Sequence, residues 1–63
     1  MKASELNKGD KFVRLDEVDP NRVGNVLVAG GVLGGRMFCA RKYNEIGTIQ
    51  ILYCDDKVMR LDL

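Results

Sequence analysis

The stretch VLVAGGVLGGR, residues 26–36, contains four of the seven glycines of this 63-residue chain. An apolar run precedes the glycines, and the segment RMFCARKY, residues 36–43, alternates in polarity after them. Glycine tolerates backbone conformations that reverse the chain, and two such runs around it are typical of antiparallel strands. The stretch therefore predicts a β structure in which a glycine-rich loop at 30–35 connects two strands.

The same letters also read as G-x-x-x-x-G-R, which resembles a phosphate-binding loop. Such a loop needs a lysine and then a hydroxyl side chain at the start of a helix. Here Arg36 and Met37 stand at those positions, and the segment that follows has the alternation of a strand. We therefore interpret the glycines as structural. Two alternatives stay open for Val32 and Leu33 between them: they plug the fold, or they are exposed to a partner.

Five strands are predicted along the chain, at 11–16, 22–29, 36–43, 48–54 and 58–63. Residues 4–7, SELN, predict one short helical turn. Connections this short join antiparallel neighbours rather than parallel strands. The fold class predicted is all-β, a single domain over 1–63. Its architecture is a small five-stranded antiparallel SH3-like barrel or a strongly bent sheet.

The turn NEIG, residues 44–47, predicts the register of one hairpin. If it closes symmetrically, Phe38 lies opposite Tyr53 and Ala40 opposite Ile51, and these residues with Lys42 and Ile49 face the core. Met37, Cys39, Leu52 and Cys54 then share the other face. For the last hairpin, a three-residue turn at 55–57 places Met59, Leu61 and Leu63 inside. In this register Cys39 and Cys54 are diagonal neighbours, too far apart for a disulfide, so we expect two free thiols.

Composition excludes several classes of function. Apolar residues make up 46% of the chain and charged residues 30%, which is typical of a folded domain. There is no histidine and there are only two cysteines, which excludes the usual zinc sites and the commonest general base. Adjacent acids such as Asp55 and Asp56 are typical of turns. We expect no enzyme, no cofactor, no metal, no membrane span and no secretion signal, and hence a cytoplasmic location.

Two surfaces are candidates for binding. The first is an apolar surface for a protein partner, and its residues are Val32, Leu33, Met37 and Leu52. The second follows from residues 20–44, which carry four basic residues and no acidic one. It is a basic strip for weak nucleic-acid binding, formed by Arg22, Arg36, Arg41, Lys42 and Tyr43. The oligomeric state stays open between monomer and homodimer.

The opening SELNKGDKFVRL resembles the start of small proteins of unknown function encoded in bacteriophage and prophage genomes. These begin with a Ser-Glu-Leu-x-x-Gly-Asp-Lys-Phe-like stretch, and the match here is carried by residues 4–6 and 9–12. The segments CARKYNEIG and YCDDKVMRLDL are similar more loosely. The resemblance implies a small β-barrel of phage origin in the host cytoplasm and no catalytic residues. It implies no established activity. From the candidate surfaces we expect a protein-interaction module, and with a phage origin it would modulate a host protein.

Overall fold

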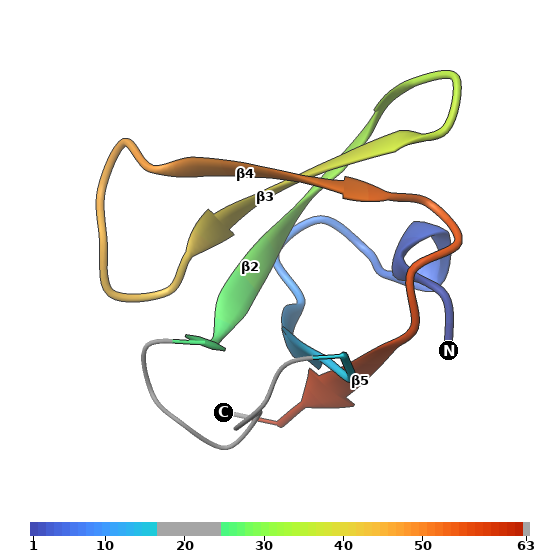
Figure 1. Cartoon of the computed structure of the whole chain (residues 1–63). Helices are drawn as coiled ribbons and strands as arrows, with labels where there is room; N and C mark the ends of the chain where they lie inside the picture. Colours follow the sequence, from blue (N-terminus) through green and yellow to red (C-terminus); the bar gives the residue numbers. More distant parts are fainter. Residues whose placement is uncertain (17–24, 63) are drawn as a thin grey trace.

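The structure of the chain is a computed structural model, and it describes residues 1–16 and 25–62 (Figure 1). It confirms an all-β fold with five antiparallel strands and one short helical turn. The elements are a 3-10 turn, η1 (Ala3–Glu5), and the strands β1 (Lys11–Arg14), β2 (Leu27–Gly34), β3 (Met37–Lys42), β4 (Ile49–Tyr53) and β5 (Val58–Leu61).

The five strands form one bent sheet in the order β4-β3-β2-β1-β5. β4 and β5 follow each other along the chain but lie at opposite edges of the sheet, so the sheet is not closed (Figure 1). β2 is the longest strand, and its first half pairs with β1 and β3 together, whereas its second half pairs with β3 alone. The sheet thus bends around β2, and one concave face encloses the core.

The prediction of a last hairpin between β4 and β5 is wrong. β5 pairs instead with β1, from Lys11 opposite Leu61 to Arg14 opposite Val58. Val58 is therefore buried, at 1% exposure, and Met59 is 43% exposed, the reverse of the predicted pattern. Leu61 is half-buried, and Leu63 lies outside the described residues. The tight turn predicted at 55–57 does not form a hairpin, because residues 54–57 form a corner that leads the chain from β4 at one edge of the sheet to β5 at the other.

That corner is held by the N-terminal segment. The N–H of Ala3 donates to the carbonyl of Asp56 at 2.9 Å, and the N–H of Ser4 donates to the carbonyl of Cys54 at 3.1 Å. The N–H of Val58 donates to the carbonyl of Met1 at 2.9 Å. The backbone groups of the corner are thus paired with η1 and its neighbours rather than within a hairpin.

β2 continues through the glycines that were predicted to form a loop. Register shifts between Ala29 and Gly31 and between Val32 and Gly34 mark two irregularities of the β-bulge kind. Bulges insert an extra residue and increase local twist, so the strand bends without ending. The connection to β3 shrinks to a two-residue turn at Gly35 and Arg36, and Gly35 has a φ of 56°. A positive φ at this first turn position is what a two-residue hairpin loop favours.

The register between β3 and β4 is one residue away from the prediction. Phe38 lies opposite Leu52, and Met37 lies opposite Tyr53. The turn between β3 and β4 is not symmetric. The N–H of Tyr43 donates to the carbonyl of Val26 at 2.9 Å, so Tyr43 stays paired with the segment that leads into β2. A slip of one residue exchanges the two faces of a strand. Leu52 is therefore 3% exposed, whereas Tyr53 is 66% exposed.

The core is built around two phenylalanines. The rings of Phe12 and Phe38 meet edge to face, with centroids 6.5 Å apart at 78°. Both side chains are at most 1% exposed, and Ala3 of η1 closes one end of the cluster at 0%. The other members are Leu6, Leu27, Ala29, Ala40, Leu52 and Val58. Each edge-to-face pair is typically worth about 0.5–1.5 kcal/mol beyond its buried area.

The opening motif has a structural explanation in this fold. Leu6 and Phe12 are core residues. Gly9 has a φ of 94°, which suits a residue without a side chain. The Asp10 carboxylate accepts a hydrogen bond from the N–H of Asn7 at 2.8 Å, and the Asp10 carbonyl accepts one from the N–H of Ala29 at 2.8 Å. The motif thus forms a turn that leads from η1 into β1 beside β2.

Candidate functional site

The hairpin between β2 and β3 projects from the rest of the molecule (Figure 1). Val32 and Leu33 near its end are 56% and 57% exposed, so of the two alternatives for these residues the exposed one is correct. The second bulge lies between Val32 and Gly34, where Leu33 is the extra residue of β2. An extra strand residue has no partner on the neighbouring strand, which leaves Leu33 at the surface.

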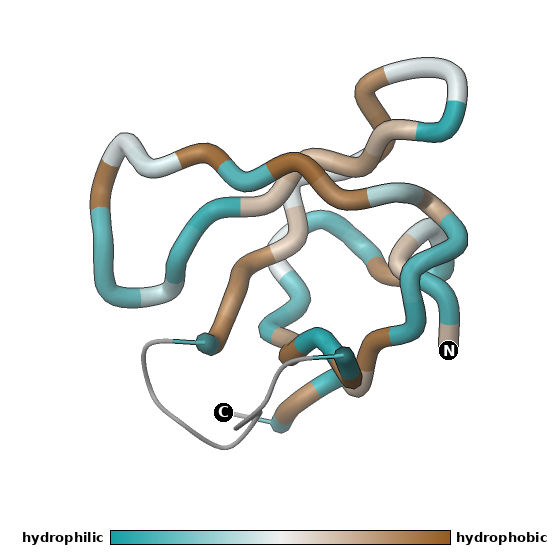
Figure 2. Tube along the Cα trace, viewed as in Figure 1, coloured by the Kyte–Doolittle hydropathy of each residue, from teal (hydrophilic) through white to brown (hydrophobic). Residues whose placement is uncertain are grey.

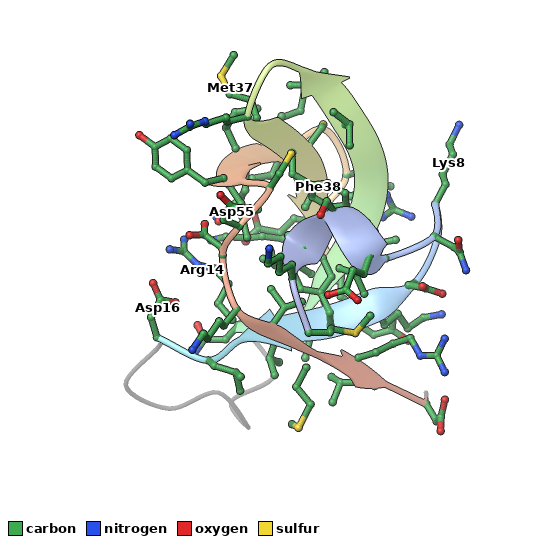
Figure 3. All side chains as sticks on the ribbon, turned by 90° about the vertical axis from the view of Figure 1, so that its right-hand side faces the viewer. Lys8, Arg14, Asp16, Met37, Phe38 and Asp55 are labelled. Carbon is green, nitrogen blue, oxygen red and sulfur yellow. The ribbon has the colours of Figure 1, made fainter. Side chains whose placement is uncertain are left out.

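Met37 and Tyr53 extend this apolar surface onto β3 and β4. They lie opposite each other and are 49% and 66% exposed. Figure 3 shows Met37 pointing away from the molecule and Phe38, the next residue, pointing inward. We call Val32, Leu33, Met37 and Tyr53 the tip patch. Val32 lies opposite the inward-facing Phe38, whereas Met37 is on the opposite face, so the tip patch covers both faces of the hairpin.

Leu52 does not belong to this surface. It was predicted to share a face with Met37, but the observed register turns it into the core beside Phe38. Cys54 packs against the same core, and Cys39 lies between the buried Phe38 and Ala40 and so points to the other face. The two cysteines are free, as expected, but the reason is their opposite faces rather than a diagonal separation.

The outward face of β4 is more apolar than its inward face. Ile49 is 70% exposed and Ile51 is 49% exposed, although both were predicted to be core residues. Figure 2 shows hydrophobic segments along β4 and on the projecting hairpin. Contiguous exposed apolar surface of this kind marks interaction sites more often than scattered residues do. From the sequence, the apolar residues Ile49, Ile51 and Tyr53 were predicted to face the core, whereas they lie on the outward face.

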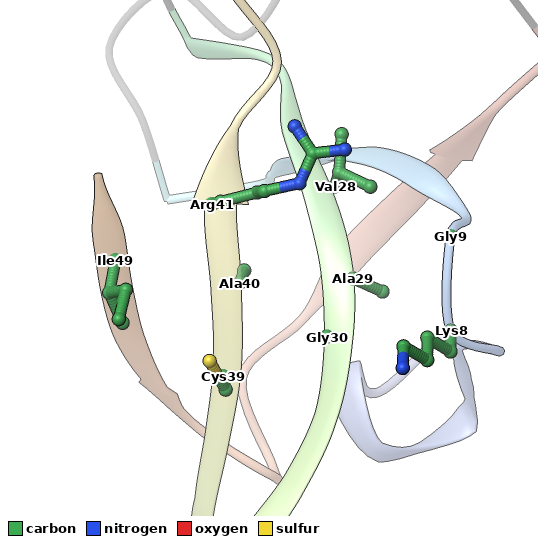
Figure 4. Close-up of a pocket in the computed structure, with 9 residues that line it drawn as sticks. All are labelled: Lys8, Gly9, Val28, Ala29, Gly30, Cys39, Ala40, Arg41 and Ile49. Carbon is green, nitrogen blue, oxygen red and sulfur yellow. The ribbon is translucent and has the colours of Figure 1, made fainter. Parts of the chain in front are cut away.

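A hollow of about 310 Å³ lies on the outer face of the sheet, where β2 runs past β3 (Figure 4). Gly30 forms part of its floor, because a Cβ at this position would lie 3.1 Å from the carbonyl oxygen of Cys39 and 3.4 Å from its Sγ. Lys8 and Arg41 line the same hollow, as does Ile49. The hollow therefore has apolar walls with two cations beside them.

The predicted basic strip is not a single surface. Arg36 lies in the hairpin turn, five residues from Arg41, which is about 16 Å along an extended strand. Arg41 and Lys42 are successive strand residues and so point to opposite faces. Lys42 lies 4.0 Å from the Glu45 carboxylate. Arg22 lies outside the described residues.

A different group of cations comes together around Arg41. Lys11, Val28, Arg41 and Ile49 lie opposite one another in a row across β1 to β4. The Nζ of Lys11 lies 5.8 Å from the centre of the Tyr43 ring. We call Lys8, Lys11 and Arg41 the basic cluster. Sequence reasoning missed both lysines because they precede the acid-free segment along the chain, and only strand pairing brings them to Arg41.

The acidic residues have local structural roles. The Asp56 carboxylate accepts a hydrogen bond from the N–H of Tyr53 at 2.9 Å, and the Glu45 carboxylate accepts one from the Thr48 hydroxyl at 2.8 Å. Asp55 lies 3.9 Å from the Nζ of Lys2. Within residues 1–16 and 25–62, no group of three Cys, Asp or Glu side chains is placed to hold a metal ion. The acidic residues at positions 17 and 19 lie outside the described residues.

No helix in the described part of the chain is long and apolar enough to cross a membrane. Comparison of the chain with known proteins finds no matching family model, no matching curated protein and no matching solved structure.

Proposed function

We propose that the chain is a protein-interaction module with an SH3-like arrangement of strands, and that the tip patch is its binding surface. The observation that carries the proposal is a group of four large apolar side chains that are 49–66% exposed. Three of them lie at the end of the projecting hairpin, and the fourth, Tyr53, lies beside them on β4, opposite Met37. Loops and hairpin ends on a rigid scaffold often carry binding residues. The hairpin is anchored by the core residue Phe38 next to Met37, so the tip patch is presented in a defined position.

The shape of the tip patch suggests the chemistry of its partner. Because apolar residues cover both faces of the hairpin, the partner that fits is a protein with an apolar groove into which the hairpin inserts. Arg36 is exposed in the turn between Gly35 and Met37. A cation at the leading end of the hairpin favours a groove with an acidic rim, since complementary charges fix orientation and speed association. The modulation of a host protein, which we expect of a phage-encoded interaction module, stays a prediction.

Affinity capture from a bacterial lysate tests this proposal. The immobilised protein is compared with Leu33→Glu, which puts a charge into the tip patch, and with Ile46→Glu. Ile46 is the matched control, because it is fully exposed but lies in the turn between β3 and β4, away from the hairpin end. Circular dichroism checks that both variants are folded.

We expect a protein that binds the wild type and Ile46→Glu and is lost with Leu33→Glu. Burying an unpaired charge in an apolar groove typically costs several kcal/mol, enough to abolish capture. A partner that both variants retain, or one that both lose equally, contradicts the tip patch as the binding surface.

A second candidate function is weak nucleic-acid binding, and the basic cluster is the observation that favours it. Lys11 and Arg41 lie on either side of Val28 in one row, and the Nζ of Lys11 lies over the Tyr43 ring. Cations that contact phosphates make affinity fall steeply with salt. We expect titrations with labelled single- and double-stranded oligonucleotides to show binding at low salt that is lost in Arg41→Ser but kept in Lys57→Ser. The absence of any binding at low salt eliminates this function.

A further inference from the structure

The outer edge of β4 is an unpaired edge of the sheet. β4 ends the strand order, and no described residue pairs with it on the side away from β3. The other edge strand, β5, differs, because its first residue exchanges hydrogen bonds with Met1 and its neighbour Lys57 forms a bridge with Lys2. Proteins usually cover or charge such edges, since unpaired N–H and C=O groups attract another strand.

The backbone groups of alternate β4 residues point toward this edge. The N–H of Cys54 donates to the carbonyl of Arg36 on the β3 side at 2.7 Å. Because N–H and C=O groups alternate in direction along an antiparallel strand, those of Leu52 and Gln50 also point to β3. Those of Ile49, Ile51 and Tyr53 consequently point away from it.

Asp56 closes one end of the edge. Its carboxylate accepts a hydrogen bond from the N–H of Tyr53 at 2.9 Å, and its own N–H donates to the carbonyl of Tyr53 at 3.0 Å. Both outward backbone groups of Tyr53 are thus occupied. Two residues remain with outward groups that no described residue pairs with, Ile49 and Ile51. They offer two donors and two acceptors, which we call the free edge of β4.

The free edge of β4 is complementary to itself. When two copies of β4 lie antiparallel with a twofold axis at Gln50, Ile49 of each copy lies opposite Ile51 of the other. These are two hydrogen-bonded pairs, and they use all the unpaired groups of both copies. An axis at Ile51 would instead oppose Ile49 to Tyr53, whose groups Asp56 already occupies. The hydrogen bonds therefore select one register.

The side chains agree with the same register. On the outer face it places isoleucine opposite isoleucine twice, and β-branched pairs stabilise adjacent strands. β4, with sequence IQILY, carries no charge, so the pairing opposes no like charges along the strand. We propose that the free edge of β4 pairs with a second copy of this chain, antiparallel about Gln50, and joins two sheets into one. Such isologous contacts are the commonest form of dimer, and they require a surface that is complementary to itself.

Self-association is tested on the intact chain by sedimentation equilibrium from about 10 μM to 1 mM, the range in which a small interface dissociates. We expect the average mass to rise toward that of a dimer. Ile51→Lys places a lysine on the edge strand and should keep the protein monomeric throughout the range. Met59→Lys is the matched control, since Met59 is a similarly exposed apolar residue on the other edge strand. It should dimerise as the wild type does.

A cysteine cross-link tests the register. The proposed axis brings the two Gln50 Cα atoms to about 4.5 Å, as in a pair without backbone hydrogen bonds, which a disulfide can span. The two Ile51 Cα atoms are then diagonal, at about 7–8 Å. In a chain with Cys39→Ser and Cys54→Ser, mild oxidation should link Gln50→Cys into a covalent dimer far faster than Ile51→Cys.

Three outcomes overturn the proposal. The first is a wild-type chain that stays monomeric at the highest concentration, which would leave the edge to a different partner or to none. The second is a dimer that Ile51→Lys does not disrupt although that variant is folded by circular dichroism. The third is a cross-link that forms faster at Ile51→Cys than at Gln50→Cys, which would mean a different register.

Discussion

Gly31 adopts a backbone conformation that other residues rarely take. It follows the first bulge of β2, lies opposite Cys39 and has a φ of 114°. A Cβ added here would meet nothing within 4 Å, so space does not restrict the position. The restriction is conformational, because a positive φ of this size strains any residue that has a side chain. Gly31 therefore allows β2 to continue past the bulge into the hairpin.

We predict that Gly31→Ala lowers the free energy of unfolding by about 1–3 kcal/mol, which is the usual cost of a strained backbone conformation. Urea unfolding followed by circular dichroism measures the change. Val32→Ala is the control at the neighbouring position, where the side chain is 56% exposed and φ is not positive. Its effect should be clearly smaller. An unchanged midpoint for Gly31→Ala would contradict the role assigned to this glycine.

The glycines explain why the boundaries of β2 were predicted poorly from the sequence. In a sequence, glycine is equally compatible with a loop and with a bulge inside a strand. Residues 30–34 were predicted to be loop, yet they form five of the eight residues of β2, because β3 supplies partners on the far side of each bulge. The two glycine pairs look alike in the sequence, but one supports a bulge and the other the turn. Only pairing between strands distinguishes them.

At the scale of elements, the existence of the strands and their order along the chain could be predicted, but not the partner of β5 or the face that β4 buries. Alternation in the segments at 36–43 and 48–54 indicated β3 and β4 correctly. The face was chosen by assuming that the bulkier set, Ile49, Ile51 and Tyr53, is buried. The structure instead buries Leu52 and exposes those three. A strand that exposes its more apolar face departs from the rule of patterning, and such departures are expected at functional surfaces.

The register yields a direct prediction for β4. Leu52→Ala should lower the free energy of unfolding by about 2–5 kcal/mol, because it leaves a cavity beside Phe38 in the core. Tyr53→Ala, which changes the next residue, should cost less than about 1 kcal/mol, because its side chain is 66% exposed. Thermal and urea unfolding of the two variants give the comparison. A larger loss for Tyr53→Ala than for Leu52→Ala would support the register that the symmetric turn predicted.

At the scale of the whole molecule, the connection between β4 and β5 depends on the N-terminal segment. β4 and β5 do not pair, so strand pairing alone leaves the connection between them unsupported. Met1, Ala3 and Ser4 supply the missing backbone partners at residues 54–58. Ala3 is also completely buried in the core. The sequence predicted a helical turn at this end but not its contacts, because these contacts join residues fifty or more positions apart.

Deletion of residues 1–5 tests this dependence. It removes three hydrogen bonds between peptide groups at residues 54–58, the one that the Met1 amino group donates to the Val58 carbonyl, and the buried Ala3. With a net contribution of about 1 kcal/mol for each bond, the loss is about 3 kcal/mol or more. A domain of this length has a total stability of roughly 3–9 kcal/mol, so the shortened chain should be substantially unfolded at 37 °C. Thermal unfolding by circular dichroism and the dispersion of amide NMR signals measure this.

The matched control, Lys2→Ala with Ser4→Ala, changes two exposed side chains of the segment but keeps the backbone bonds, and it should remain folded. If the shortened chain unfolds at the same temperature as this control, the N-terminal segment does not hold the corner between β4 and β5.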